Sequence, residues 1–115
     1  MIGADAAESR SLGLRAPAKI NLGLRVTGRR ADGYHELDSV MLPLDLADEV
    51  TLELRAAREP RVTLRLDPDV AGVPSGAANL TVRAAELFLE RSGVDRSVAI
   101  RLTKRIPAAA GLGGG

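Results

Sequence analysis

The segment Lys104–Gly115 carries the clearest chemical signal of the sequence, because glycine occupies four of its last five positions. Glycine has no Cβ and takes up positive φ readily, so such a loop can turn its backbone N–H groups toward one small, highly charged object. A phosphate group is the usual ligand of a loop of this kind. We therefore predict a phosphate-binding loop made of Pro107, Ala108, Ala109, Ala110, Gly111, Leu112, Gly113, Gly114 and Gly115.

Two other interpretations of the glycine run were weighed. It is not a Walker A loop, because no Gly-Lys-Ser/Thr follows the glycines. A flexible linker is also glycine-rich, but it more commonly carries Ser, Thr or charged residues, and residues 107–115 contain none. A phosphate loop normally opens a helix, and the sequence stops before one. We therefore expect the chain to be the front part of a longer, nucleotide-dependent enzyme.

A second candidate site lies on the segment Ala18–Val26, where polar and aliphatic residues alternate. This period of two predicts a half-buried strand with Lys19, Asn21 and Gly23 on the face opposite the aliphatic side chains. A solvated strand face would give the same pattern. Lys19 is one of only two lysines in an arginine-rich chain, and a lysine places a compact point charge. That observation favours a binding or catalytic role for this face.

The only tyrosine and the only histidine, Tyr34 and His35, follow directly on a loop with an Asp32–Gly33 turn signal. Taken singly, a histidine is more often a structural hydrogen-bonding residue, and a tyrosine usually packs. Adjacent at a loop exit, they offer a flat surface and ring nitrogens. The pair suits the recognition of a planar ligand such as a nucleobase.

The elements that must position these residues are predicted from apolar periodicity. Alternation predicts further strands over residues 42–46, 50–54, 62–66 and 98–102, with Pro43 at an edge or a bulge. Asn79 reads as the N-cap of a helix that ends at Ser92–Gly93, and its stripe of Leu80, Leu87 and Phe88 is predicted to be core. Residues 1–13 are expected to be a flexible lead-in, and residues 14–115 one domain. The fold class is α+β, a mixed, mostly antiparallel sheet with helices on one face.

Composition narrows the function classes. The chain is 45% hydrophobic and 27% charged with a net charge of +1, which is ordinary for a soluble domain. The absence of cysteine excludes disulfides and thiolate metal sites, and we predict no metal-ligating side chains. Met1–Arg10 has early acids and no apolar core of a signal peptide, and no stretch approaches the ~20 apolar residues of a membrane span. We expect a cytoplasmic protein without a membrane partner.

Three separated stretches together resemble the 4-diphosphocytidyl-2-C-methyl-D-erythritol kinase family of the GHMP kinase superfamily. They are Pro17–Leu22, Arg29–Glu36, and Lys104–Pro107 running into the glycines. The resemblance extends from about Leu14 to the end of the chain. It implies a ribosomal-protein-S5-domain-2-like fold and an ATP-dependent phosphoryl transfer to the 2-hydroxyl of the methylerythritol unit, a step of non-mevalonate isoprenoid biosynthesis.

The same resemblance implies roles for the candidate residues. Lys19 matches the lysine at the catalytic centre, and Asn21 lines the same substrate pocket. Tyr34 and His35 match a pair that recognises the cytosine by stacking and hydrogen bonding, respectively. The partner is thus a small molecule, a cytidine diphosphate conjugate, and not a nucleic acid.

For the nucleotide, the resemblance implies that the loop of residues 107–115 wraps the phosphates of ATP, expected with Mg²⁺. Asn79 matches an asparagine near the adenine, and Lys104 falls in the same neighbourhood. Residues 108–110 are alanines where many members carry glycines. The family's catalytic aspartate lies past residue 115, so we expect the 115-residue chain alone to be inactive.

Two alternatives remain open at this point. Another GHMP kinase with a different alcohol substrate would carry a similar loop. A nucleic-acid-binding α+β module shares the general architecture, but it needs a basic face, which the near-neutral charge with interleaved acids does not favour.

Overall fold

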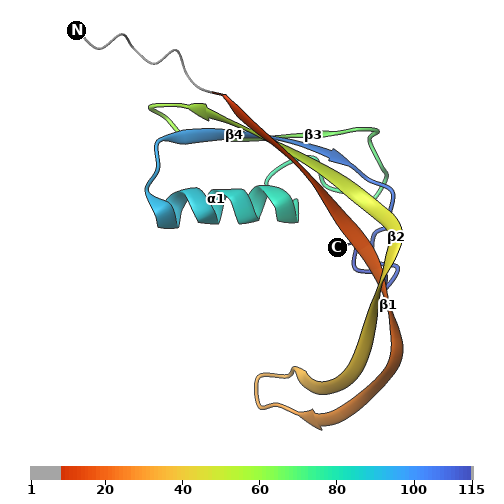
Figure 1. The fold of residues 1–115 in the computed structure, drawn as a ribbon. Coiled ribbons are helices and arrows are strands. Elements are labelled where there is room, and N and C mark those ends of the chain that lie inside the picture. The colour runs from red at the N-terminus through yellow and green to blue at the C-terminus, as the bar shows by residue number, and fades with distance from the viewer. Residues whose placement is uncertain (1–8, 115) are drawn as a thin grey trace, which may run out of the picture.

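Within residues 9–114, which the computed structural model describes, the chain folds into one mixed sheet with a helix on one side (Figure 1). The elements, in chain order, are β1 (Arg10–Arg29), β2 (His35–Ala56), β3 (Val62–Leu66), α1 (Leu80–Ser92) and β4 (Arg96–Thr103). The four strands lie in the order β1-β2-β4-β3. β1 pairs antiparallel with β2, and β2 with β4, whereas β3 and β4 are parallel. The predicted α+β class, with a mostly antiparallel mixed sheet, is confirmed.

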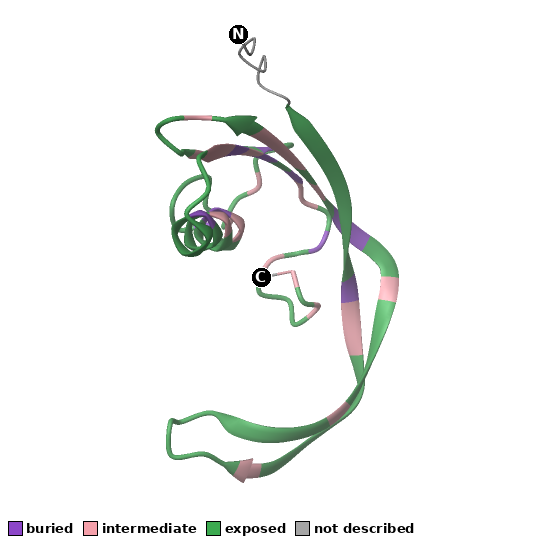
Figure 2. Ribbon diagram, turned by 60° about the vertical axis from the view of Figure 1, so that its left-hand side comes forward, coloured by how far each residue is buried: buried purple, intermediate pink, exposed green. Residues whose placement is uncertain are grey.

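β1 and β2 form one long hairpin that extends beyond the other two strands. β4 pairs with β2 only over residues 49–56, so the part of the hairpin between residues 18 and 46 is a two-stranded ribbon, here named the hairpin arm. The arm curves, so that α1 and the C-terminal loop lie on its concave side (Figures 1 and 2). The Asp-Gly turn signal is confirmed: Gly33 has φ +88°, and Arg30 N–H donates to Tyr34 O at 2.7 Å.

The N-terminal boundary of β1 differs from the expected lead-in. Residues 1–8 lie outside the described part of the chain, but Arg10–Gly13 are already in the strand and pair with Thr51–Leu54. Only Leu12 among these four residues is apolar, so their own sequence gives little strand signal. The hydrogen bonds offered by β2 make them a strand, a tertiary effect that overrides local preference.

A β-bulge changes which side chains share a face with Lys19. Asn21 pairs with Met41 but Gly23 pairs with Val40, so Leu22 is an extra residue in β1. One inserted residue moves all later side chains of the strand to the opposite face. Lys19 and Asn21 do share a face, as predicted, but Gly23 lies on the other one. Leu24 and Val26 join the Lys19 face instead.

Three of the four aliphatic residues predicted to be half-buried on β1 are exposed, and only Ile20 has intermediate burial. The exposed fractions of Leu22, Leu24 and Val26 are 63%, 57% and 56%. The strand pattern was correct, but within residues 9–114 the ribbon has no second layer to cover it (Figure 2). Pro43 does lie at an irregularity, next to a register shift between Pro17 and Lys19, as expected for a residue without an N–H.

The helix has the predicted ends but buries a different face. Asn79 caps its N-terminus, with the side chain accepting from Thr81 N–H, and Gly93 ends it in the left-handed conformation at φ +65°. Its buried residues are Val82 and Leu89. The prediction that Leu80, Leu87 and Phe88 form the core stripe is wrong, because they are 60%, 52% and 64% exposed. The helix carries two apolar stripes, and periodicity alone does not tell which one meets the sheet.

The core lies between α1 and the sheet. Leu89 packs with Val98 and Ile100 of β4, and buried positions on β4 and α1 face each other in Figure 2. Partly buried aliphatic residues of the other strands and of the helix surround this cluster: Val50, Leu52, Leu54, Val62, Leu64 and Ala85. This small core fixes the end of β4, from which the glycine-rich loop departs.

Candidate phosphate-loop site

The glycine-rich loop follows β4 directly and alternates in backbone conformation. Ala109, Gly111 and Gly113 have φ values of +56°, +74° and +81°. Left-handed residues that alternate along a loop turn successive N–H groups to one side, the arrangement of an anion-binding nest. Ala109 is the only residue other than glycine with positive φ among residues 9–114. Gly115, the last residue of the predicted loop, lies outside the described part of the chain.

Lys19 of β1 is bound to this loop through both its backbone and its side chain. Its N–H donates to Leu112 O at 2.9 Å, and its Nζ donates to Gly111 O at 3.1 Å. A Cβ on Gly113 would lie 3.2 Å from Lys19 Cγ, so loop and strand are in close contact. The two candidate features lie 92 residues apart in the chain, and the fold brings them together.

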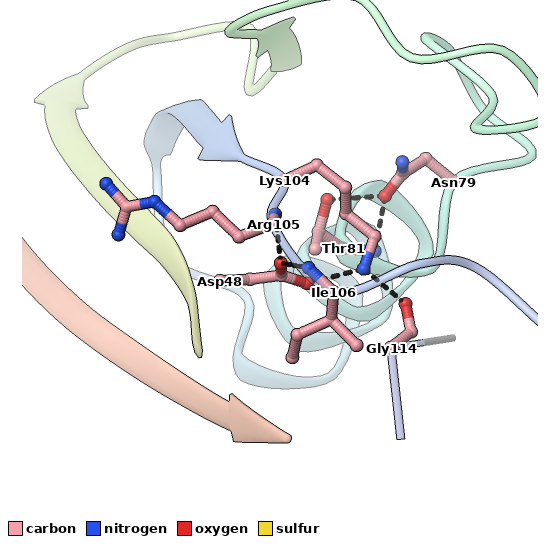
Figure 3. Close-up of polar contacts among 7 residues, drawn as sticks. All are labelled: Asp48, Asn79, Thr81, Lys104, Arg105, Ile106 and Gly114. Atoms are coloured by element: carbon pink, nitrogen blue, oxygen red, sulfur yellow. Dashed lines mark hydrogen bonds and ion pairs between the residues drawn. The ribbon is translucent and has the colours of Figure 1, made fainter. Parts of the chain in front are cut away.

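A buried carboxylate, Asp48 of β2, holds the beginning of the loop. The residue is 6% exposed, and its Oδ1 accepts from Arg105 N–H at 2.6 Å and from Ile106 N–H at 2.8 Å (Figure 3). Burial raises the pKa of Asp48, but the hydrogen bonds and the Lys104 charge outweigh burial and hold that pKa below its ordinary value of 3.8. Asp48 is therefore ionised, and both of its oxygens accept hydrogen bonds.

Asp48 was missed from the sequence. The only available signal was the break in apolar alternation between the patterns of residues 42–46 and 50–54. Its partners are 56 to 58 residues away in the chain, so no local pattern could indicate them.

Lys104 links Asp48 to the far end of the loop. Its Nζ donates to Asp48 Oδ2 at 2.5 Å and to Gly114 O at 2.8 Å, with only 5% of the side chain exposed (Figure 3). The loop is tightly packed here, because a Cβ on Gly114 would lie 2.7 Å from Ile106 Cγ2. Ile106 is itself 2% exposed. The loop thus begins and ends on one buried ion pair.

A cavity of about 410 Å³ opens beside the loop. Lys104, Gly113 and Gly114 lie on one side of it, and Asn79 and Thr81 at the start of α1 on another. Most of the remaining wall is aliphatic: Ala16, Val50, Val73, Pro74, Ala78, Leu80, Leu102 and Ala108. An apolar cavity with a few convergent polar groups is the usual form of a small-molecule site.

Asn79 lines this cavity, but its amide is mostly occupied. Its Oδ1 accepts from Thr81 N–H at 2.9 Å and from Thr81 Oγ1 at 2.7 Å, and its Nδ2 donates to Pro74 O at 2.8 Å. Both lone pairs of the oxygen are used, which leaves the second N–H of the amide for a ligand. These three hydrogen bonds therefore make Asn79 a structural part of the cavity wall, and its remaining N–H can also bind a ligand.

The predicted substrate residues lie along the hairpin arm. Asn21 Oδ1 accepts from Ser39 Oγ at 3.2 Å, and His35 pairs with Arg29 at the end of the arm. Tyr34 is 71% exposed, with the Arg30 guanidinium 5.9 Å from its ring centroid. Asn21 is on the Lys19 face, two residues beyond it. Tyr34 and His35 are in the turn region, separated from the loop by the length of the arm.

Comparison with known proteins shows which family this chain is similar to. Residues 79–115 match the family model described as the GHMP kinases N terminal domain. The 4-diphosphocytidyl-2-C-methyl-D-erythritol kinase of Anaeromyxobacter dehalogenans (strain 2CP-C) is 54% identical over 87% of this chain, and that of Acetivibrio thermocellus 46% over 91%. These alignments cover 31% and 35% of the relatives. The chain thus spans about a third of the length of the curated relatives it matches.

Two solved structures share the fold. A crystal structure of 4-(cytidine 5'-diphospho)-2C-methyl-D-erythritol kinase aligns with a TM-score of 0.70 and 44% identity, covering 90% of this chain and 35% of that one. Homoserine kinase from Cytophaga hutchinsonii aligns with a TM-score of 0.60 and 28% identity, over 90% and 30%. The chain is thus similar to the GHMP kinases, through the family model over residues 79–115 and through the fold over 90% of its length. Among them, it is similar in sequence to the 4-diphosphocytidyl-2-C-methyl-D-erythritol kinases.

Within residues 9–114, no helix is long and apolar enough to cross a membrane. No group of three or more His, Cys, Asp or Glu side chains in that range is placed to hold a metal ion.

Proposed function

We propose that this chain forms the phosphate-loop and acceptor-binding part of an ATP-dependent kinase. The kinase phosphorylates the 2-hydroxyl of 4-diphosphocytidyl-2-C-methyl-D-erythritol, a cytoplasmic step of non-mevalonate isoprenoid biosynthesis. The observation that carries the proposal is the docking of Lys19 on the glycine-rich loop, at 3.1 Å from Nζ to Gly111 O. The substrate is the one for which the similar kinases are named.

The proposed role of Lys19 is to position and stabilise negative charge. Phosphoryl transfer asks a protein mainly for alignment of the reactants and for neutralisation of charge. One hydrogen of the Lys19 ammonium is bonded to Gly111 O, and an ammonium has three donors. The other two are available for oxygens of the acceptor or of the transferred group. The bond to Gly111 O holds the ammonium beside the proposed phosphate loop.

The residues at the loop fit a nucleoside triphosphate. The alternating left-handed residues 109, 111 and 113 suit the phosphates, and the aliphatic cavity wall beside Asn79 suits a flat base. ATP, when bound, supplies the phosphoryl group. Mg²⁺ is usually held by one or two carboxylates together with phosphate oxygens. Asp48 is not such a ligand, because its oxygens accept from Lys104 and two backbone N–H groups.

The hairpin arm is proposed to bind the cytidine conjugate. Asn21 continues the Lys19 face toward the turn, and the bond from Ser39 fixes its oxygen, which leaves its Nδ2 to donate to a ligand. At the turn, the exposed ring of Tyr34 is available for stacking on cytosine. His35 adjoins it and can add a hydrogen bond.

A fusion protein tests this proposal. In it, this chain replaces the aligned segment of the kinase of Anaeromyxobacter dehalogenans. We expect it to transfer phosphate from ATP to 4-diphosphocytidyl-2-C-methyl-D-erythritol. Tyr34→Ala in the fusion should raise KM for this substrate while KM for ATP stays the same. Equal losses for both substrates would count against the assignment of Tyr34.

A second candidate function is phosphorylation of another alcohol, which the likeness to homoserine kinase favours. The fusion protein distinguishes the two by a substrate comparison. Activity on homoserine or on free methylerythritol at the rate seen with the cytidine conjugate would refute the proposed substrate. A requirement for the cytidine moiety would support it.

A further inference from the structure

We propose that Asp48 is a positioning residue, which sets the shape of the phosphate loop by binding its first residues directly and its last ones through Lys104. The proposal deepens the proposed function and rests on it for its kinetic test. Asp48 also lines the cavity beside the loop, but its proposed role is not contact with a reacting group. Its effect passes through the backbone N–H groups of residues 105 and 106 and through the Lys104 ammonium.

The contacts of Asp48 connect the beginning of the loop with its end. Oδ1 accepts from Arg105 N–H and Ile106 N–H at the point where the chain leaves β4. Oδ2 accepts from Lys104 Nζ, which also donates to Gly114 O at 2.8 Å. One carboxylate thereby ties the beginning of the loop to its end, eight to ten residues later (Figure 3).

Burial strengthens this linkage. The Lys104 and Asp48 side chains are 5% and 9% exposed, so solvent can compensate only weakly for a lost partner. Removal of one member of a buried pair leaves the other uncompensated, which is strongly unfavourable. The lysine must then move, and the carbonyl of Gly114 loses its donor. The loop has little freedom to adjust, because Gly114 is packed on Ile106 and Lys104.

This geometry also specifies what Lys104 does. Its ammonium lines the cavity beside the loop, where it could be taken for a phosphate-binding charge. Its position against Asp48 means that the pair presents little net charge to a nucleotide. Lys104 therefore acts on the nucleotide chiefly through the position of Gly114.

The test compares Asp48→Asn, Lys104→Met and the double variant in the fusion protein. Glu49→Gln is the matched control, because Glu49 is the neighbouring acid, is half exposed, and bonds only the Arg105 side chain, at 2.8 Å. We expect each single variant to raise KM for ATP by roughly tenfold to a hundredfold, as for the loss of one charge-assisted hydrogen bond. KM for the cytidine conjugate and the control should change by less than about twofold.

The double variant separates the effect of Asp48 on the position of the loop from its effect on the stability of the fold. It leaves no buried charge unpaired, so its thermal unfolding midpoint should recover toward the parent value. Its KM for ATP should stay raised, because Gly114 O still lacks the Lys104 donor. Recovery of both quantities together would overturn the proposal and assign Asp48 a structural role only.

A second measurement is independent of catalysis. Amide hydrogen exchange in the 115-residue chain should accelerate at Arg105 and Ile106 in Asp48→Asn, and at neither in Glu49→Gln. In Lys104→Met these two amides should stay protected while KM for ATP rises in the fusion. Unchanged exchange in Asp48→Asn, or an unchanged KM for ATP, would refute the positioning role. An inactive fusion with altered exchange would instead refute the proposed function and leave the contacts of Asp48 established.

Discussion

Gly114→Ala tests whether the packing of the loop end controls nucleotide affinity. The new Cβ would lie 2.7 Å from Ile106 Cγ2, 2.9 Å from Lys104 Nζ and 3.0 Å from Pro107 O. Ile106 is fully enclosed at 2% exposure, and a backbone carbonyl cannot turn away cheaply. The loop end must therefore move, and the bond from Lys104 Nζ to Gly114 O breaks.

The magnitude follows from these two losses. Overpacking costs about 1–3 kcal/mol, and a hydrogen bond from a charged donor contributes about 1.5–3 kcal/mol. The two costs are not additive, because the movement that relieves the overpacking also breaks the hydrogen bond from Lys104. ATP binding requires the native loop conformation, and we expect its restoration in the variant to cost about 2–4 kcal/mol. This cost corresponds to a roughly 30- to 700-fold weaker affinity for ATP.

Gly111→Ala is the comparison variant for this prediction. Its Cβ would meet nothing within 4 Å, but the residue has φ +74°, so the variant pays only a backbone strain of about 1–2 kcal/mol. Affinity for ATP is measured for both variants by calorimetry on the fusion protein, with urea unfolding as a control of global stability. Gly114→Ala should weaken ATP more than Gly111→Ala while the urea midpoints agree. The reasoning is refuted if the two variants bind ATP equally well.

Three further predictions follow from the site and the core. Lys19→Ala in the fusion protein should lower kcat by ~10²–10³ with little change in either KM; a near-normal kcat in steady-state assays would remove Lys19 from the chemistry. The pKa of Asp48 is lower in the folded chain than its ordinary value of 3.8, so its contribution to stability is present above about pH 3.8 and is lost as pH falls through the folded pKa. Urea unfolding of the 115-residue chain from pH 7 to pH 2 should show this loss, and Asp48→Asn should flatten that part of the curve. Leu89→Ala should cost about 2–5 kcal/mol of unfolding free energy, whereas Phe88→Ala on the exposed stripe should cost less than about 1 kcal/mol in the same urea titration.

The sequence by itself determined the features that rest on neighbouring residues. The turn at Asp32–Gly33, the helix from Asn79 to Gly93 and the glycine-rich loop each depend on the backbone preferences of a few adjacent residues. These preferences act locally, so they can be recognised without knowledge of the fold. Alternation also predicted the strand over residues 18–26, with Lys19 and Asn21 on one face.

Tertiary structure alone decided which faces and partners those elements have. The bulge at Leu22 depends on the register with β2, and the buried helix face depends on where β3 and β4 lie. Asp48 meets Arg105, 57 residues away, only because β2 and β4 are neighbours in the sheet. Periodicity gives the spacing of side chains along one element but not the surface that this element meets, so the residue that holds the loop became visible only in the folded chain.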